Sequence, residues 1–298
     1  MERYVRVSET IKLGELAKEV NADVVLATDP DADRLGIYAL DTKSGEYIPF
    51  TGNMSGMLIA EYLMREKTKT NTMPANPALV KTIVTTNMSD VMTAKYDVKQ
   101  IEVLTGFKFI GEQIKLFEQS GSNNYVFGLE ESYGCLAGTH ARDKDAIVAV
   151  MMLCEAAAYY KKQGLTLWDQ MLNIYEKYGY FFNQLDNYAF EGAAGMQKMT
   201  NMMDSLRNEP PKEICGSKVI WVGDYKTGVT TDGETGLPKS NVLQFYTEDG
   251  SVVSVRPSGT EPKLKIYYSL KAKDEETANA KLEEIQTDVA ALLERAKK

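Results

Sequence analysis

Short apolar runs alternate with segments of helical periodicity through the middle of this 298-residue chain. Residues 78–85 are rich in Val, Ile and Thr, which predicts a strand, and residues 107–119 carry apolar side chains at the spacing of an amphipathic helix. A further strand-like run, residues 123–128, precedes the apolar helical segment 146–161, which we expect to be the most buried helix. This alternation predicts an α/β sandwich with a mostly parallel or mixed sheet.

Three units are predicted along the chain. Residues 1–70 contain helix and strand signals, and the polar residues 65–77 predict a linker that packs little. Residues 78–178 form the sandwich described above. Residues 181–298 carry several strand-like runs and end in a helical segment, which predicts a small α+β domain. The predicted fold class is therefore α/β, with mixed-sheet α/β sandwich domains followed by a C-terminal α+β domain.

Composition excludes several classes of protein. Hydrophobic residues make up 44% of the chain and charged residues 26%, as in an ordinary globular protein. The formal charge of −8 argues against a general nucleic-acid binder, which needs a basic face. No apolar stretch is long enough to span a bilayer. The three cysteines, Cys135, Cys154 and Cys215, are scattered, which fits a reducing cytoplasm. We expect a cytoplasmic protein with neither a nucleic-acid nor a membrane partner.

The sharpest chemical signal is the carboxylate loop, residues 29–34, which follows the apolar run 24–27. We expect that run to be a strand buried on both faces. Asp29, Asp31 and Asp33 then place three negative charges within five residues. Because like charges repel, a hard divalent cation with oxygen ligands is the simplest explanation of this pattern. The loop therefore predicts a Mg²⁺ site.

The carboxylate loop has three other possible interpretations. An EF-hand fails because Arg34 stands where that loop needs Gly, and Leu40 stands where it needs Glu. A phosphatase with an aspartate nucleophile usually has Thr or Val at the position of Asp33. An Asp-rich turn without a metal remains open.

A second motif, Arg256-Pro-Ser-Gly-Thr-Glu-Pro-Lys263, directly follows a predicted strand. The Arg256 guanidinium, the hydroxyls of Ser258 and Thr260, and the backbone at Gly259 together make a compact anion site. The motif lacks the Gly-Lys-Ser/Thr ending of a nucleotide-binding P-loop. A tight turn between two strands is the alternative.

The remaining polar motifs are weaker. Glu130 and Ser132 alternate at a strand end, so both could hydrogen-bond vicinal hydroxyls of a sugar, although a solvated loop is a common alternative. Lys108 and Lys144 lie in glycine-rich or polar settings, where a lysine is usually just solvated. His140 has no adjacent nucleophile and does not indicate a catalytic triad.

The order of these motifs resembles the α-D-phosphohexomutase superfamily, in its phosphoglucomutase/phosphomannomutase group. The resemblance implies an enzyme that interconverts glucose 1-phosphate and glucose 6-phosphate through glucose 1,6-bisphosphate, with Mg²⁺ as cofactor and a phosphosugar as partner. The matching stretches span most of the chain: residues 28–34, 105–111, 128–134, 142–146 and 256–263.

The resemblance also implies a role for each matching residue. In it Asp29, Asp31 and Asp33 bind Mg²⁺, and Glu130 and Ser132 hold sugar hydroxyls. Cationic side chains surround the reacting phosphoryl group, and further residues bind the phosphate that is not reacting. The cationic residues are Arg34, Lys108 and Lys144, and the phosphate-binding residues are Arg256, Ser258, Gly259 and Thr260.

One departure from the family pattern is large. The family's nucleophile is a phosphoserine in a Thr/Ala-Ser-His-Asn-Pro loop of an N-terminal domain, and this chain has no Ser-His dipeptide. We therefore expect a C-terminal portion that begins inside domain 2, retains domains 3 and 4, and is inactive alone. Phosphomannomutase or phosphopentomutase specificity, a non-catalytic phosphosugar-binding module and a Mg²⁺-dependent phosphatase remain alternatives.

Overall fold

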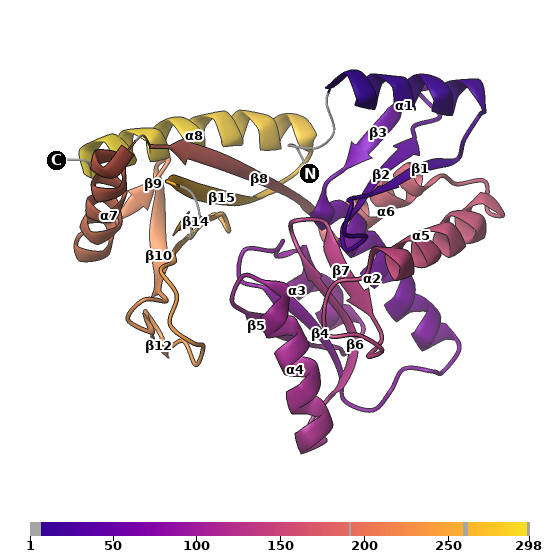
Figure 1. Ribbon diagram of the computed structural model, residues 1–298, viewed down its shortest axis with the longest axis horizontal. Helices are drawn as coiled ribbons and strands as arrows, with labels where there is room; N and C mark the ends of the chain where they lie inside the picture. The colour runs from indigo at the N-terminus through magenta and orange to yellow at the C-terminus, as the bar shows by residue number, and fades with distance from the viewer. Residues whose placement is uncertain (1–6, 191, 259–261, 297–298) are drawn as a thin grey trace. The chain divides into compact units, whose positions relative to one another are not determined.

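The computed structural model describes residues 7–190, 192–258 and 262–296 (Figure 1). The chain divides into two compact units, Met1–Tyr178 and Gly179–Lys298. Both mix helices with sheets, so the predicted α/β fold class is confirmed. The finer division of the first unit near residues 70–78 stays a prediction. None of the helices within the described ranges is both long and apolar enough to cross a membrane.

The first unit opens with a small antiparallel sheet in the order β1-β2-β3. The expectation that residues 24–27 are buried on both faces is wrong, because β1 is an edge strand and these residues are only partly buried. The strand β3 was not predicted, since its four residues include Pro49 and show no clear alternation. The elements are α1 (Val7–Glu19), β1 (Val24–Thr28), β2 (Leu35–Leu40) and β3 (Tyr47–Phe50).

A second sheet of the same unit has the order β5-β4-β6-β7. β4 pairs in parallel with β5 and β6, whereas β7 is antiparallel to β6, which confirms the predicted mixed sheet. β7 was not predicted; its four residues form a strand because they pair with β6. The strands are β4 (Pro77–Thr82), β5 (Lys99–Val103), β6 (Asn124–Glu130) and β7 (Gly134–Ala137).

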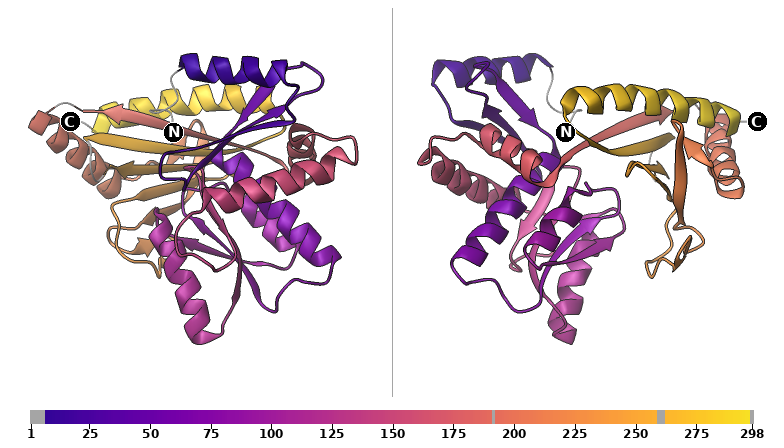
Figure 2. Two further views of the ribbon diagram at one scale, coloured as in Figure 1. Left: turned by 45° about the vertical axis from the view of Figure 1, so that its right-hand side comes forward. Right: turned by 180° about the vertical axis from the view of Figure 1, so that it is seen from behind.

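Helices cover both faces of this second sheet (Figure 2). The amphipathic helix α4 (Phe107–Ser120) packs its apolar side against β4 and β6, as its periodicity predicted. On the other side, α2 (Gly52–Lys69) approaches β6 closely at Gly56, where an added Cβ would lie 2.6 Å from Leu129 Cδ1. The remaining helices of the unit are α3 (Met88–Lys95), α5 (Ala146–Lys161) and α6 (Leu167–Tyr178).

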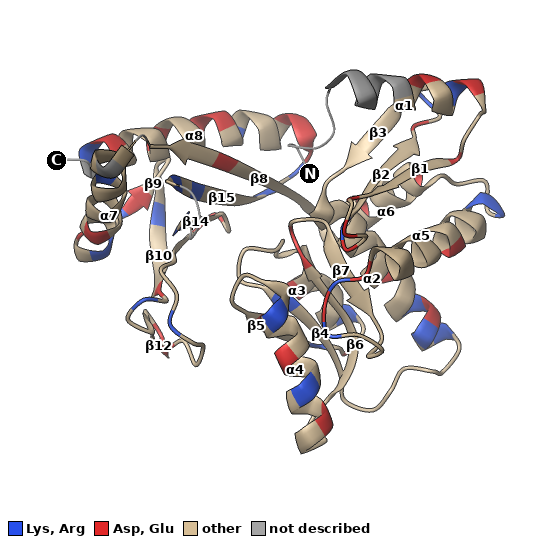
Figure 3. Cartoon of the chain, in the orientation of Figure 1, with Lys and Arg blue, Asp and Glu red and all other residues tan. Residues whose placement is uncertain are grey.

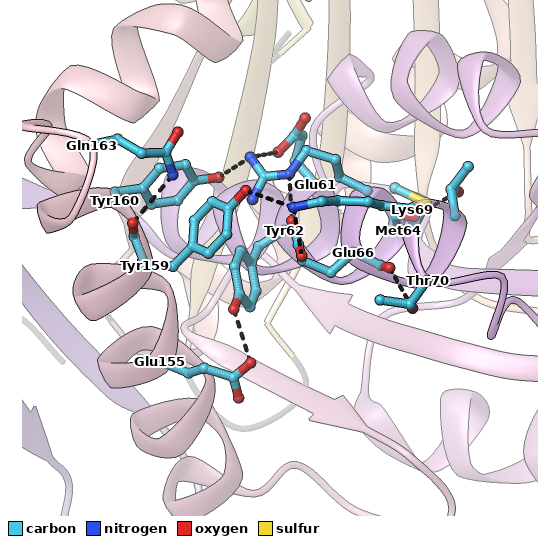
Figure 4. A network of polar contacts seen from close by, with 12 residues as sticks. Glu61, Tyr62, Met64, Glu66, Lys69, Thr70, Glu155, Tyr159, Tyr160 and Gln163 are labelled. Carbon is cyan, nitrogen blue, oxygen red and sulfur yellow. Dashed lines mark hydrogen bonds and ion pairs between the residues drawn. The ribbon is translucent and has the colours of Figure 1, made fainter.

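The predicted linker over residues 65–77 is wrong in its first part, because α2 continues through Lys69. The Arg65 guanidinium carbon lies 5.5, 4.8 and 5.0 Å from the ring centroids of Tyr62, Tyr159 and Tyr160. Figure 4 shows these three tyrosines close to one another. Arg65 Nη1 also donates a 2.7 Å hydrogen bond to the Tyr160 hydroxyl. A long polar side chain thus packs between two helices, which composition alone does not show.

The helix α5 is less buried than expected. Ala149, Leu153 and Ala156 face the interior, but Ile147 and Met151 are 63% and 58% exposed. Apolar residues occupy nearly every position of this segment, so the sequence gives no phase that distinguishes an inner from an outer face.

The second unit is an eight-stranded antiparallel sheet with two helices, in agreement with the predicted α+β domain. The sheet order is β12-β11-β10-β13-β14-β15-β8, with β9 paired to β10. Buried methionines of α7 and aliphatic residues of α8 pack on β13, β14 and β15 to form the core. The elements are β8 (Tyr180–Ala189), α7 (Gly192–Asn208), β9 (Glu213–Ile214), β10 (Ser217–Asp224), β11 (Val229–Thr230), β12 (Gly233–Glu234), β13 (Leu243–Thr247), β14 (Val252–Pro257), β15 (Lys263–Ala272) and α8 (Glu275–Ala296).

Candidate active site

The carboxylate loop connects β1 to β2 and is closed by its own first aspartate. Asp29 Oδ1 accepts hydrogen bonds of 3.2 Å from the backbone N–H groups of both Asp33 and Arg34. Burial alone would raise the pKa of Asp29, but these N–H groups, together with the charge of Arg34, lower it overall. Ala32 adopts a φ of 54°, a left-handed conformation that helps turn the chain back. Asp29 is therefore an anion that shapes the loop.

Asp33 meets a lysine from a distant loop. Lys144 Nζ lies 2.8 Å from Asp33 Oδ2 and 3.2 Å from Asp143 Oδ1, and its side chain is only 13% exposed. Burial alone would lower the pKa of Lys144, but hydrogen bonds to both aspartates raise it overall, so the ammonium is charged at neutral pH. Arg34 Nε lies 3.8 Å from Asp33 Oδ1. These contacts bring Lys144, Arg34 and Asp33 together, and their predicted roles at the metal and the phosphoryl group stay predictions.

Glu130 ends β6 beside this ion pair. It is 6% exposed, and Ser132 Oγ donates a 2.8 Å hydrogen bond to its Oε1. Burial raises the pKa of Glu130, although Ser132, Lys144 and Arg34 partly offset that effect. Gly134 is needed here because an added Cβ would lie 2.5 Å from Lys144 Cδ and 3.0 Å from Glu130 Oε1. Glu130 and Ser132 therefore face one another and lie close to Lys144.

Backbone pairing joins these loops. Arg34 forms an isolated antiparallel bridge with Gly134, and the Leu35 N–H donates to the Tyr133 carbonyl at 3.2 Å. The Ala146 N–H donates to the Ala32 carbonyl at 3.1 Å. Three segments far apart in sequence are thus held together, and they bring carboxylates, cationic side chains and the Ser132 hydroxyl to one place. Figure 3 shows how acidic and basic residues are distributed over the elements of the chain.

Lys108 does not join this cluster. It is exposed at the start of α4, and its Nζ lies 4.8 Å from the centroid of the Phe109 ring. Among the contacts of the described residues, Lys108 makes none with Asp33, Glu130 or Lys144. Its predicted place at the reacting centre stays a prediction.

The predicted phosphate loop lies in the second unit, between β14 and β15. Arg256 is half-buried and pairs across the ladder with Lys265, while the Ser258 N–H donates to the Lys263 carbonyl at 2.7 Å. The described ends of the motif thus belong to two paired antiparallel strands, which either of the two interpretations drawn from the sequence allows. Gly259 and Thr260 lie outside the described residues. The phosphate-binding role of this loop stays a prediction.

Two features of the site escaped the sequence interpretation. Asp145 caps the N-terminus of α5, where its Oδ1 accepts from the N–H groups of Ile147 at 2.8 Å and Val148 at 3.0 Å. Its Oδ2 lies 2.9 Å from His140 Nε2. An aspartate directly before an apolar helical segment is a standard N-cap signal and could have identified Asp145. The pairing with His140 has no such signal.

The carboxylate loop offers oxygen ligands, the type that Mg²⁺ prefers. Asp33 Oδ1 is a buried carboxylate oxygen without a hydrogen-bond partner, as expected of an atom that a hard cation would satisfy. Against this, no group of three His, Cys, Asp or Glu side chains within the described ranges is arranged closely enough to hold a metal. The aspartates of the loop therefore offer the type of ligand that the cation needs, while Lys144 Nζ forms an ion pair with the other oxygen of Asp33, Oδ2.

Comparisons with known proteins agree with this description. Residues 51–178 match the family profile described as phosphoglucomutase/phosphomannomutase, alpha/beta/alpha domain III. Residues 212–292 match the profile described as the C-terminal domain of the same family. The two matches occur in the order that the motifs predicted.

Individual relatives give the same result. A phosphoglucomutase of Staphylococcus epidermidis is 40% identical over 262 residues, which cover 86% of this chain and 46% of the relative. The solved structure of Paramecium parafusin, described as a phosphoglucomutase, superposes with a TM-score of 0.66 at 22% identity and covers 98% of this chain and 49% of the other. An Aspergillus fumigatus N-acetylphosphoglucosamine mutase, solved with GlcNAc-6P and magnesium, superposes with a TM-score of 0.52 at 15% identity and covers 95% and 53%.

The chain spans about half the length of the relatives it matches. The matched profiles, the identity to the staphylococcal relative and the shared fold point to one family. Together they show that the chain belongs to the phosphoglucomutase/phosphomannomutase family.

Proposed function

We propose that this chain supplies the metal, sugar and phosphate sites of a cytoplasmic phosphohexomutase that interconverts glucose 1-phosphate and glucose 6-phosphate. The observation that carries the proposal is the contact of Lys144 with Asp33 beside the buried Glu130–Ser132 pair. This contact brings a positive charge close to two side chains that can hydrogen-bond to sugar hydroxyls, which supports the proposal. The identity to a phosphoglucomutase supports glucose as the sugar, and the free cysteines fit a reducing cytoplasm.

In this proposal, the cationic and the anionic residues of the first unit have different roles. Lys144 and Arg34 offer donors to the oxygens of a phosphoryl group, whose negative charge is spread over those oxygens during transfer. Glu130 and Ser132 bind vicinal hydroxyls and so orient the sugar. Asp29, Asp31 and Asp33 would hold Mg²⁺, and the magnesium in the related mutase supports this choice. When bound, the cation polarises phosphoryl oxygens as a Lewis acid.

The second unit would supply orientation. The Arg256 guanidinium and the Ser258 and Thr260 hydroxyls, with the backbone at Gly259, suit the phosphate that is not reacting. Lys108 would contribute charge at the reacting centre. A ligand with a phosphate at each end, such as glucose 1,6-bisphosphate, suits a chain that has two separate anion-binding motifs.

The donor of the phosphoryl group is the missing part of the proposal. The family's reaction uses a phosphoserine followed by histidine, and no Ser-His dipeptide occurs in the sequence. We therefore propose that the chain by itself binds phosphosugar without turnover. A phosphatase that uses Asp29 as nucleophile is disfavoured, because Asp29 Oδ1 already accepts two backbone hydrogen bonds.

Titration calorimetry with glucose 1-phosphate in the presence of Mg²⁺ tests the proposal. Lys144→Met should weaken binding by about tenfold, since a charge-assisted hydrogen bond contributes roughly 1.5 kcal/mol. Lys115→Met is the matched control, because Lys115 is exposed on α4 away from the cluster. Equal affinities of the two variants would refute the assignment of Lys144. A coupled assay that detected glucose 6-phosphate formation by the chain alone would refute the proposed lack of turnover.

A further inference from the structure

His140 is the one histidine of the sequence, and it lies in the loop that joins β7 to α5. Its Nε2 is 2.9 Å from Asp145 Oδ2, and its side chain is 49% exposed. The loop has a second, independent anchor. Arg142 Nη2 contacts both oxygens of Glu118 on α4 at 2.6 and 2.7 Å, and its Nη1 donates to the Thr139 carbonyl. The loop is thus fastened to α4 by Arg142 and to the start of α5 by His140.

Both carboxylate oxygens and the backbone N–H of Asp145, the partner of His140, form hydrogen bonds. While Oδ2 faces His140, Oδ1 caps α5, and the Asp145 N–H donates to the Cys135 carbonyl at 2.9 Å. Burial alone would raise the pKa of Asp145, but the hydrogen bond from His140 and those from the N–H groups of Val148 and Ile147 lower it overall. The carboxylate is therefore ionised at neutral pH, and Nε2–H of His140 is its side-chain donor.

The residues on either side of Asp145 both contact the carboxylate loop. Lys144 precedes it and places Nζ 2.8 Å from Asp33 Oδ2. Ala146 follows it and donates its N–H to the Ala32 carbonyl at 3.1 Å. A rotation of the Asp145 backbone would move both contacts at once. Whatever fixes Asp145 therefore also fixes the lysine that faces the aspartates.

We propose that His140 is a positioning residue of the phosphoryl site: it holds Asp145 at the start of α5 and thereby sets Lys144 and Ala146 against the carboxylate loop. The inference rests on the proposed function for its consequence, but its structural part stands on contacts that need no ligand. A merely solvated loop histidine would leave the contacts of residues 144–146 unchanged when removed.

Amide hydrogen exchange of the intact chain, followed by NMR, tests the structural part. In His140→Ala, the amides of Ala146, Ile147 and Val148 should exchange at least tenfold faster than in the unsubstituted chain, because their acceptors lose a fixed position. His140→Gln keeps an N–H donor and should restore part of the protection. Glu118→Ala, which removes the partner of Arg142 in the same loop, is the matched control and should leave these three amides unchanged. Unaltered exchange in His140→Ala would overturn the proposal.

Affinity for glucose 1-phosphate with Mg²⁺ tests the consequence. His140→Ala should weaken binding about three- to tenfold, while His140→Gln stays within about twofold of the unsubstituted chain. Faster exchange with unchanged affinity in a chain that binds the sugar phosphate would overturn the positioning role. If the unsubstituted chain binds no sugar phosphate, the proposed function fails, and the exchange result alone decides whether His140 holds the start of α5.

Discussion

Gly134→Ala is the most direct test of how tightly the site is built. Gly134 lies in β7 with a φ outside the left-handed region, so alanine fits its backbone. The obstacle is space: the new Cβ would lie 2.5 Å from Lys144 Cδ and 3.0 Å from Glu130 Oε1. Ordinary carbon–carbon contacts are about 3.5–4.0 Å, so the stem of Lys144 has to move by roughly 1 Å. That movement pulls Nζ away from Asp33.

The expected loss of stability is about 2 kcal/mol. Overpacking a filled site typically costs about 1–3 kcal/mol, and the partly buried ion pair adds at most about 1 kcal/mol. For a unit of this size, such a loss lowers Tm by roughly 4–8 °C. Lys144→Ala removes the colliding stem, so the cost of Gly134→Ala should be smaller in that background.

Urea unfolding monitored by tryptophan fluorescence measures this loss. Each unit has one tryptophan, so a Trp221→Phe background leaves Trp168, which packs on Phe50, to report on the first unit. Gly14→Ala is the control, because nothing lies within 4 Å of its added Cβ and alanine favours the helix α1 by up to about 1 kcal/mol. The reasoning fails if Gly134→Ala is as stable as that control, or if its cost is the same with and without Lys144.

Substitutions at three further positions test other parts of the first unit. Lys81 is fully buried, and its ion-pair partners Glu102 and Asp90 are 38% and 48% exposed and can be rehydrated. Lys81→Met keeps the volume but removes the donor to the carbonyls of Thr85 and Thr86, so it should cost about 1–3 kcal/mol, whereas Lys81→Ala should cost more because it also leaves a cavity; urea unfolding distinguishes them. Burial raises the pKa of Glu130 above its unfolded value, so the contribution of Glu130 to the free energy of unfolding is complete below the unfolded pKa and is lost as the pH rises through the folded pKa. Glu130→Gln should therefore gain stability relative to the unsubstituted chain between pH 4 and pH 7. Equal curves of unfolding free energy against pH for the two chains would contradict this. Arg65→Lys should lose about 1–2 kcal/mol, because an ammonium cannot reproduce the guanidinium contacts with the three tyrosine rings and the Tyr160 hydroxyl; a loss below 0.5 kcal/mol by urea unfolding would contradict it.

The elements that the sequence predicted well are those whose side chains have a clear period. The helix α4 was located within one residue because Ile110, Ile114 and Phe117 mark a single buried face. The burial of α5 was overestimated because its residues are apolar on all sides, so only packing determines that Ile147 faces outward. The strand β7 depends on its pairing with β6, which no local pattern encodes.

The site was predictable residue by residue but not as an arrangement. Asp33, Glu130 and Lys144 each stand in a chemically unusual motif, so each could be proposed from local sequence. Their proximity depends on backbone pairing between residues a hundred positions apart, namely the bridge from Arg34 to Gly134. Local sequence contains no signal for such a contact, and only the resemblance to a family implied it.

Backbone strain indicates where the arrangement is most constrained. Tyr133 has a φ of 68°, a left-handed conformation that costs a non-glycine residue on the order of 1 kcal/mol. The conformation is imposed from two sides: the Leu35 N–H holds the Tyr133 carbonyl, and Gly52 packs so closely that an added Cβ would lie 2.5 Å from the Tyr133 nitrogen. The turn it creates brings Ser132 back onto Glu130. A strained backbone conformation persists where the surrounding structure fixes it, and here Leu35 and Gly52 do so. The geometry of the Glu130–Ser132 pair therefore depends on contacts from two other segments of the chain.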